Sequence, residues 1–292
     1  MVTSNRVYLP HAKALVFHWR DISTLPDYRL PDQLWTLYNM EAPTNTPQNL
    51  WPTSEFNLTA SYRMDSDIYV PYGLVDKRRE AFNLNIDVHN KSKMVAWFVS
   101  DCDTPGHREW YVEELAKYIQ VNVYGKCGNY TCEPRRSPRC WERVAKEYWF
   151  YLSFENSVCR DYVTEKLFDA LTHNIVPVVF GGARYDLILP HMSYVDANRL
   201  TPHQLADRLA SIARNRTEYL RYFRWKHHFR VHTSLELQVF CQLCRRLNQR
   251  SDYGRLSQHT GAQVSKWWFT GGKCRQWVGV EEDEVGVKNV FY

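Results

Sequence analysis

A short stretch of the chain, residues 154–166, carries most of the side chains whose types and spacing suggest chemistry. It reads FENSVCRDYVTEK and stands between two apolar segments. An amide, a phenol, an acid and a base stand within it: Asn156, Tyr162, Glu165 and Lys166. Burying polar groups costs free energy unless partners satisfy them. The stretch therefore predicts a binding site for a charged ligand.

Arg108 and Lys166 indicate that this ligand is an anion. Each is expected near the start of a helix that follows an apolar strand, where backbone amides and the helix dipole favour negative charge. An arginine fork and a lysine point charge together suit a phosphate. An ordinary alternative stays open for each residue. Arg108 then is a solvated helix residue, Asn156 caps a turn, and Glu165 and Lys166 are normal helix-start residues.

Glu41 is the candidate for proton transfer. It ends the apolar segment QLWTLYNM and begins a proline-bearing loop. A carboxylate in such a place can serve as a general base, although it can also simply start a loop. Two acid triplets, Asp65-Ser-Asp67 and Asp101-Cys-Asp103, match a metal-ligand pattern. Such triplets are frequent by chance, so they give only a weak indication of metal binding.

The elements that must position these residues alternate from Met94 onward. Apolar runs predict buried strands, and helical spacing or a capping box predicts helices. The expected strands are 94–100, 120–125, 148–154 and 175–182, and the expected helices are 108–119, 161–173 (with Asp161 as N-cap) and 201–213. This alternation indicates a parallel sheet covered by helices, which binds ligands outside the carboxyl ends of its strands.

The first 90 residues predict a second, smaller α/β unit. Strand-like segments lie at 12–19, 33–40 and 56–63, separated by loops that contain proline. A polar segment, 83–93, is a candidate linker. Two such units joined by a short linker would place a cleft between them.

Composition supports a folded chain with an anionic ligand. The 292 residues are 44% hydrophobic and 24% charged, which suits one large domain or two medium ones. The net charge of +5 is too mild and too dispersed to indicate nucleic acid. No run reaches the roughly 18 apolar residues of a membrane span, and the start lacks a signal-peptide core.

Cysteines and glycosylation sequons point to an oxidising, secretory compartment. There are eight cysteines, and the sequons begin at Asn57, Asn90, Asn129 and Asn215. The pair Cys241-Gln-Leu-Cys244 also has zinc-knuckle spacing, but disulfides are the favoured interpretation. A secretory chain without a targeting segment implies either that an N-terminal anchor is missing from this sequence or that the compartment is inferred wrongly.

The blocks FENS, DYVTEKLFDAL and VPVVFGG resemble the signature of the α1,3-fucosyltransferases, glycosyltransferase family 10. Other blocks agree and come in the expected order: FHWRDI, MEAPTNTP, FNLTASYRMDSDIYVPYG, MVAWFVSDC, SYVDA and YFRW. The resemblance runs from about residue 12 to Cys274. The cysteine pattern looks like that of invertebrate and plant members that fucosylate the innermost GlcNAc of N-glycans, while Lewis-type members remain an alternative.

The resemblance implies the α/β GT-B architecture, two Rossmann-like domains with a cleft between them. Residues 1–90 would form the acceptor-side domain, 91–265 the GDP-fucose-binding domain and 266–292 a C-terminal tail. The implied reaction is inverting transfer of L-fucose from GDP-fucose to a GlcNAc hydroxyl in α1,3 linkage. It would need no obligatory metal, with Mn²⁺ at most a stimulant.

The resemblance also implies partners and a place in the cell. Acceptors would be N-glycan or N-acetyllactosamine structures on glycoproteins, and no nucleic acid would bind. Family members reside in the Golgi lumen as type II membrane proteins, so membrane association would need an N-terminal anchor that this sequence does not contain.

Carried over by motif position, Glu41 resembles the general base of the family. The residues that resemble its donor site are Arg108, Asn156, Tyr162, Glu165 and Lys166. In the family, C-terminal CxxC cysteines join disulfides. By that resemblance Cys274 would pair with Cys241 or Cys244, and Cys102 with Cys159.

Two departures from the family pattern motivate other functions. Ala42 stands where the family usually has serine, and Asp101 where it usually has asparagine. An acid that points toward a diphosphate would weaken donor binding. One alternative is therefore a catalytically impaired relative that binds glycans. Another is a GT-B enzyme that uses a different nucleotide sugar.

Overall fold

The computed structural model describes residues 2–22, 24–48, 55–134, 137–233, 235, 237–248, 259–283 and 286–292. The chain divides into two compact units. Unit 1 comprises Met1–Tyr72 and Ser234–Cys274, and unit 2 comprises Gly73–Thr233 and Arg275–Tyr292.

Unit 1 is built on a parallel four-stranded sheet in the order β1-β2-β4-β5. Its strands are β1 (Ala14–His18), β2 (Leu34–Asn39), β4 (Leu58–Ser61) and β5 (Ile68–Tyr69), and β3 (Glu55–Phe56) pairs with β13 (His259–Thr260). Its helices are α7 (Gln238–Asn248), α8 (Gly261–Ser265), a π-helical turn (Lys266–Thr270) and 3₁₀ turns at Arg6–His11 and Pro43–Asn45.

The late segment of unit 1 packs on the early sheet. Gln242 of α7 donates a hydrogen bond to the Tyr69 carbonyl at 3.0 Å. The buried Trp268 ring lies 5.8 Å from that of Trp19, and its indole N–H donates to Thr46 Oγ1 at 3.0 Å. Residues more than 200 positions apart thus share one core.

Unit 2 contains a parallel five-stranded sheet in the order β11-β10-β9-β7-β8. Its strands are β7 (Lys93–Phe98), β8 (Val121–Tyr124), β9 (Tyr148–Phe154), β10 (Val176–Phe180) and β11 (Val195–Asp196). Its helices are α1 (Arg108–Ala116), α2 (Pro138–Glu147), α3 (Glu165–Thr172), α4 (Tyr185–Ile188), α5 (Pro202–Arg214) and α6 (Arg216–Arg221), with 3₁₀ turns at Ala197–Arg199 and Arg224–His227.

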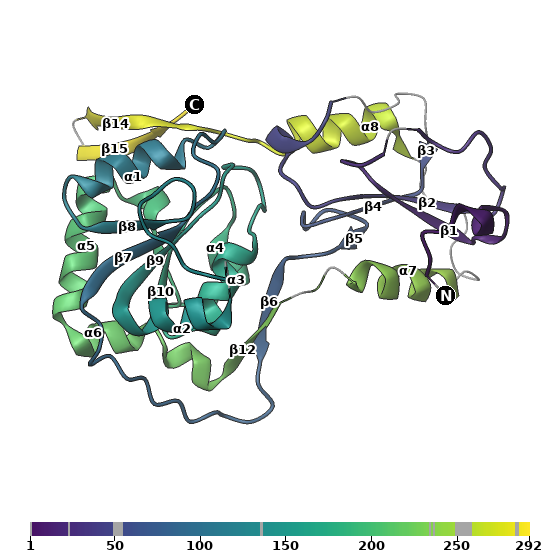
Figure 1. Cartoon of the computed structure of the whole chain (residues 1–292). Helices are drawn as coiled ribbons and strands as arrows, with labels where there is room; N and C mark the ends of the chain where they lie inside the picture. Colours follow the sequence, from purple (N-terminus) through teal and green to yellow (C-terminus); the bar gives the residue numbers. More distant parts are fainter. Residues whose placement is uncertain are drawn as a thin grey trace. The chain divides into compact units, whose positions relative to one another are not determined.

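Helices cover both faces of this sheet, as Figure 1 shows. Phe150, Leu152 and Phe154 of β9 pack in one core with residues of α1 and α5. Tyr151, one position out of phase, packs in the other core with residues of α2 and α3. Successive strand residues point to opposite faces, so a strand buried on both faces must be apolar throughout. This explains the uninterrupted apolar run of β9.

The strand order of unit 2 reverses between β7 and β9. In chain order the sheet reads 2-1-3-4-5, with β8 and β7 on one side and β9, β10 and β11 on the other. Crossover connections leave a doubly wound sheet on opposite faces at such a reversal, which opens a ligand-binding crevice at the strand carboxyl ends. The order reversal therefore lies just after Phe98 and Phe154.

The predicted α/β class with parallel sheets is confirmed, but the division of the chain differs from the predicted boundary at residue 90. Residues 73–90 belong to unit 2, because β6 (Gly73–Lys77) pairs antiparallel with β12 (Phe229–Thr233). Residues 234–265 return to unit 1.

The predicted C-terminal tail is folded into both units. The π-helical turn with Trp268 contributes to the core of unit 1. After Cys274, β14 (Trp277–Asp283) and β15 (Gly286–Phe291) form an antiparallel hairpin that belongs to unit 2. Trp277 is buried in the main core of unit 2, which anchors this hairpin.

Helix α3 begins four residues later than the prediction. It starts at Glu165 with Thr164 as its N-cap residue, whereas Asp161 has a φ of 60° in the left-handed region and lies outside the helix. By contrast, the predicted capping box of α5 is present, with the Thr201 and Gln204 side chains each bonded to the other's backbone.

The disulfide expectations are corrected. Cys102 pairs with Cys127 rather than with Cys159, and Cys132 pairs with Cys140. Cys241 and Cys244 are exposed free thiols, so neither is the partner of Cys274. Cys159 and Cys274 are disulfide-bonded as well. In the described ranges, none of the helices has the length and apolar character needed to cross a bilayer.

Candidate active site

The candidate ligand site of unit 2 lies at the carboxyl ends of its central strands. Asp101 and Arg108 follow β7, and Glu155 and Asn156 follow β9. Gly181 follows β10, whose last residue Phe180 is in register with Phe154 of β9. Three neighbouring strands thus end at the same edge, and each is followed by a segment that carries polar or conformationally permissive residues.

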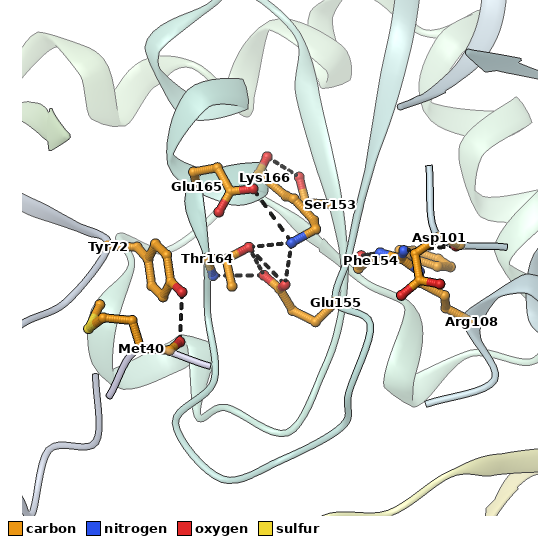
Figure 2. Close-up of polar contacts among 10 residues, drawn as sticks. All are labelled: Met40, Tyr72, Asp101, Arg108, Ser153, Phe154, Glu155, Thr164, Glu165 and Lys166. Atoms are coloured by element: carbon orange, nitrogen blue, oxygen red, sulfur yellow. Dashed lines mark hydrogen bonds and ion pairs between the residues drawn. The ribbon is translucent and has the colours of Figure 1, made fainter. Parts of the chain in front are cut away.

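Glu155 organises the start of α3. Its carboxylate accepts hydrogen bonds from the Thr164 backbone N–H at 2.8 Å and from Thr164 Oγ1 at 2.8 and 3.0 Å. Lys166 Nζ donates to the same carboxylate at 3.1 Å. Figure 2 shows the three side chains pointing toward one another. The buried acid therefore supplies the helix cap that the Thr164 side chain does not supply itself.

Lys166 is held in place but keeps access to solvent. Besides Glu155, its ammonium donates to Thr164 Oγ1 at 2.7 Å, and Glu165 lies 3.7 Å away. The Ser153 hydroxyl donates to the Lys166 carbonyl at 3.0 Å, which ties the first turn of α3 to β9. The Lys166 side chain remains 16% exposed. A cation so fixed at a helix N-terminus suits an anionic ligand.

Arg108 is buried, which rules out the solvated alternative for it. Its guanidinium donates to the Phe154 carbonyl at 2.7 Å and to the Asp101 carbonyl at 3.3 Å. It therefore bridges the ends of the two strands that flank the order reversal (Figure 2). The pKa of Arg108 is lowered because the guanidinium is buried. The nearby carboxylates, of which Glu155 has the largest effect, oppose this shift. Its first role is to brace the strand ends.

Three buried polar atoms at this edge have no hydrogen-bond partner within the described residues. They are Arg108 Nε, Asn156 Oδ1 and the Tyr185 hydroxyl. Each stands after a different one of the strands β7, β9 and β10. An unsatisfied buried polar atom costs about 1–3 kcal/mol, and such strain commonly marks a functional site. Burial raises the pKa of Tyr185 well above its usual range, and the Glu155 charge adds to the effect. The phenol therefore keeps its proton and can donate a hydrogen bond to a ligand.

Glycine is required where β10 ends, because other chain segments approach closely. A Cβ added at Gly181 would lie 2.5 Å from the Tyr185 hydroxyl oxygen, and one at Gly182 would lie 2.4 Å from the Cys159 carbonyl. The Gly181 N–H donates to Asn198 Oδ1 at 3.3 Å. The GG pair thus packs the β10 end against the loop that follows β9.

The remaining predicted donor residues lie on the same loop and helix. Tyr162 is buried, and its backbone N–H donates to the Cys159 carbonyl at 3.2 Å. Glu165 is the first residue of α3 and is partly exposed. The structure therefore brings Asn156, Tyr162, Glu165 and Lys166 onto one connection, with Arg108 at the neighbouring strand end.

Glu41 lies in unit 1, directly after the buried strand β2. Its side chain is 31% exposed, and Oε1 accepts a hydrogen bond from Arg20 at 2.9 Å. The backbone around it is fixed on both sides. The Met40 carbonyl accepts from the Tyr72 hydroxyl at 2.6 Å (Figure 2), and the Glu41 N–H donates to Asn39 Oδ1 at 3.2 Å. A partly exposed carboxylate on a rigid loop suits proton transfer.

At the two positions that depart from the family pattern, the contacts with neighbouring residues are made by backbone carbonyls. Ala42 is fully buried, and its carbonyl accepts a hydrogen bond from Thr46 Oγ1 at 2.8 Å. The Asp101 residue is exposed, and it contacts Arg108 through its backbone carbonyl. The acids of the first triplet have local partners: Asp65 pairs with Arg63 at 2.7 Å, and Asp67 accepts from Thr59 at 2.8 Å.

Glu155 and Tyr185 are the residues that the sequence interpretation did not select. Glu155 follows an apolar strand as Glu41 does, so the same signal was present for it. For Tyr185 the sequence gives no such signal, because its significance comes from its burial beside Gly181 and Glu155.

Comparison with known proteins decides the family. A model described as glycosyltransferase family 10 (fucosyltransferase) C-term matches residues 88–267, and one described as fucosyltransferase, N-terminal, matches residues 1–73. The chain belongs to glycosyltransferase family 10. The N-terminal family match ends where unit 2 begins in the structure.

Curated members of family 10 cover most of the chain. An α-(1,3)-fucosyltransferase C of Drosophila melanogaster is 39% identical over 94% of this chain and 69% of its own length. A glycoprotein 3-α-L-fucosyltransferase A of the same fly is 34% identical over 84% of this chain, which spans half of that relative. A 4-galactosyl-N-acetylglucosaminide 3-α-L-fucosyltransferase 9 of Bos taurus is 34% identical over 92% of this chain and 74% of its own length.

Solved structures of α1,3-fucosyltransferases share the fold. An α1,3-fucosyltransferase with GDP-fucose aligns with a TM-score of 0.52 and 12% identity, over 75% of this chain and 78% of that chain. The form with GDP gives the same TM-score at 13% identity, over 78% and 81% of the two chains. This likeness confirms the predicted α/β, GT-B type of fold with Rossmann-like units.

Proposed function

We propose that this chain is an α1,3-fucosyltransferase that transfers L-fucose from GDP-fucose to a GlcNAc hydroxyl of a glycoprotein glycan. Unit 2 binds the donor, with Arg108, Asn156, Tyr162, Glu165 and Lys166 at the donor site. Unit 1 supplies Glu41 as the general base and serves the acceptor. The family membership and the printed activities of its relatives support the reaction, and the geometry of the two units supports these roles.

The observation that carries the donor assignment is the edge of unit 2 where the strand order reverses. There a fixed ammonium, a helix N-terminus and three buried polar atoms that have no partner in the described part of the chain lie at the carboxyl ends of β7, β9 and β10. A nucleoside diphosphate sugar carries both the charge and the hydrogen-bonding groups that such an edge requires. Oxygens of the diphosphate or sugar can accept from Tyr185 and Arg108, and a hydroxyl or amine can donate to Asn156.

The proposed chemistry is a single displacement with inversion at the anomeric carbon. The Glu41 carboxylate takes the proton from the acceptor hydroxyl while the oxygen of that hydroxyl bonds to the anomeric carbon. The bond from this carbon to the GDP oxygen breaks, and GDP leaves with the bonding electron pair. Lys166 and the α3 dipole stabilise the charge that develops on the diphosphate.

The proposal assigns this stabilisation to the protein, so the reaction does not depend on a metal ion. Addition of EDTA should leave the rate within about twofold, and Mn²⁺ should at most stimulate it. A loss of activity in EDTA that added Mn²⁺ restores would instead show that the leaving group needs a cation.

The first experiment is a transfer assay with purified chain and GDP-fucose. An N-glycan core acceptor and an N-acetyllactosamine acceptor are offered side by side, and products are identified by mass spectrometry and linkage analysis. We expect transfer to the innermost GlcNAc of the N-glycan core. Transfer to N-acetyllactosamine alone would assign a Lewis-type activity, and GDP binding without transfer to either would leave a glycan-binding relative.

The donor is tested by competition. GDP should inhibit transfer more strongly than UDP, because the proposal assigns GDP-fucose as the donor. Stronger inhibition by UDP would contradict that assignment.

The site of action we propose is the Golgi lumen, in agreement with the disulfide bonds Cys102–Cys127 and Cys132–Cys140.

A further inference from the structure

A hollow of about 660 Å³ lies in unit 2, on the outer side of α1. Its walls are α1, the first turn of α5 and the β14–β15 hairpin, which Figure 1 shows beside α1. None of the residues proposed to bind the donor lines it. Its volume falls within the range of small-molecule sites, about 300–1,000 Å³.

Helix α1 presents two different faces because of the spacing of its residues. Tyr111, Val112 and Leu115 are buried in the core of unit 2. Trp110 and Tyr118 line the hollow instead. Tyr118 lies two residues beyond the end of α1, in the turn that follows the helix. Two aromatic rings that line one hollow can pack on the faces of successive pyranose rings of one saccharide.

Several exposed apolar side chains line the hollow. Trp110 is 45% exposed and Tyr118 is 54% exposed. Val280 of β14 and Val287 of β15 line the opposite wall and are exposed as well. Together these side chains give the hollow the apolar and aromatic lining that is usual for small-molecule sites.

The walls of the hollow are held in place by contacts of their own. The Trp110 ring stacks on His107 at 3.8 Å between centroids, and Tyr118 lies 4.7 Å from His203. The backbone N–H of Trp277 donates to the Gly106 carbonyl at 3.2 Å, which ties β14 to the start of α1. Gln204 Nε2 donates to the Val287 carbonyl at 3.3 Å, which ties α5 to β15. The aromatic faces are thus presented on a braced frame.

The charges at the hollow select against an anionic ligand. Glu113 and Glu114 both line it. Glu114 is paired with Lys117 at 2.6 Å, and the charge of the exposed Glu113 also acts on Lys117. An ionised carboxylate only accepts hydrogen bonds. The complementary ligand is therefore neutral, rich in hydroxyl donors, and flat enough to lie on aromatic rings.

We propose that this hollow is a second carbohydrate-binding site that takes a neutral saccharide of two to three pyranose units. The C–H faces of the sugar rings pack on Trp110 and Tyr118, and hydroxyl groups donate to Glu113. The inference deepens the proposed function, on which it rests, because it assigns the ligand to the glycan of a glycoprotein acceptor. The hollow would then hold part of that glycan away from the donor site.

Hydrogen–deuterium exchange with the neutral probe N,N′,N″-triacetylchitotriose tests this site directly. The full chain is used without GDP-fucose, so the result does not depend on turnover. The probe should slow amide exchange in α1 and β14. The double variant Trp110→Ala/Tyr118→Ala should lose this protection and bind the probe at least roughly tenfold more weakly. Tyr28→Ala, which removes an aromatic ring of similar exposure, is the matched control.

The outcomes separate this inference from the proposed enzyme activity. Absence of protection in α1 and β14, or protection that the double variant retains, would overturn the saccharide site even if the chain transfers fucose. Protection of these segments by an oligolysine peptide instead of the saccharide would assign the hollow to a basic protein segment and overturn it as well. Protection that depends on both aromatic rings would support it even in a chain without transfer activity.

Discussion

Two glutamates follow buried strands in the two units, and their surroundings differ in kind. Glu41, after β2 of unit 1, is 31% exposed and pairs with the exposed Arg20. Glu155, after β9 of unit 2, is 1% exposed and accepts from Thr164 and Lys166. The first carboxylate is partly open to solvent and has one exposed ion-pair partner. The second is enclosed, and its charge holds a helix start and a lysine in place.

The difference teaches that position after a strand does not by itself assign a role. A general base needs access to its substrate and freedom to change charge. A positioning residue needs burial and a full set of partners. Four substitutions test whether Glu41 acts as the general base and Glu155 as a positioning residue.

The largest effect on catalysis is expected for Glu41→Gln. The amide keeps an oxygen for Arg20 but cannot accept the proton of the acceptor hydroxyl, so kcat should fall by about 10²–10⁴-fold. GDP affinity and the unfolding midpoint should remain unchanged, because the contacts of Glu41 lie within unit 1 and are partly exposed. The checks are steady-state kinetics, calorimetric titration with GDP and thermal unfolding.

Arg20→Gln is the matched control for that variant. It removes the ion-pair partner and leaves the carboxylate, so it should change kcat far less than Glu41→Gln does. Near-normal turnover of Glu41→Gln would remove Glu41 from the role of base. A fall of equal size in both variants would show that the pair, rather than the carboxylate, is what matters.

The largest effect on stability is expected for Glu155→Gln. The neutral amide would place an N–H₂ group or a weaker acceptor against Thr164 and Lys166, with a loss of about 1–3 kcal/mol in the free energy of unfolding. Urea unfolding followed by tryptophan fluorescence measures this loss. The affinity for GDP should fall at the same time, because Lys166 loses its anchor.

A double-variant cycle separates positioning from general damage. Glu155→Gln combined with Lys166→Met removes both charges, so the double variant should be more stable than the sum of the single effects predicts. Strict additivity would mean that the 3.1 Å contact between Glu155 and Lys166 carries no coupling, and Glu155 would then lose its assignment as a positioning residue.

Sequence reasoning predicted regular elements well where burial alone decides them. The apolar run 148–154 is a strand over that range, and the Thr201-Pro signal starts α5 as expected. It failed where long-range pairing decides. Nothing local in residues 73–77 reveals that they pair with 229–233, nor that residues after 234 return to the first unit.

The candidate site shows the same limit. Each predicted donor residue does lie at or near a strand end of unit 2. The alternation of strands and helices, which the sequence shows, is enough to put these segments there. The sequence could not show that Arg108 is buried against the Phe154 carbonyl, or that the α3 cap comes from Glu155 and not from Asp161. Both facts depend on which residues the fold brings together across nine or more positions.

Lys166→Ala should weaken GDP binding, and it should also lower the free energy of unfolding because it removes one partner of the buried Glu155 carboxylate. The side chain is 16% exposed and offers its ammonium at the start of α3. Loss of a hydrogen bond to a charged group is worth about 1.5–3 kcal/mol, which corresponds to roughly 10–100-fold in affinity. Lys126→Ala, which removes an exposed lysine of the same unit, is the control for net charge. Equal weakening in both variants would mean that Lys166 acts only through the overall field.

The smallest effect is expected for Asp101→Asn, which restores the residue that the family usually has. The exposed Asp101 braces Arg108 through its backbone carbonyl, and the substitution leaves that carbonyl in place. Removal of an exposed charge usually changes free energies by less than about 0.5 kcal/mol, so GDP affinity should change by less than about twofold. A clear increase in affinity would mean that the carboxylate reaches the diphosphate. The aspartate at position 101 would then lower the affinity of unit 2 for the donor.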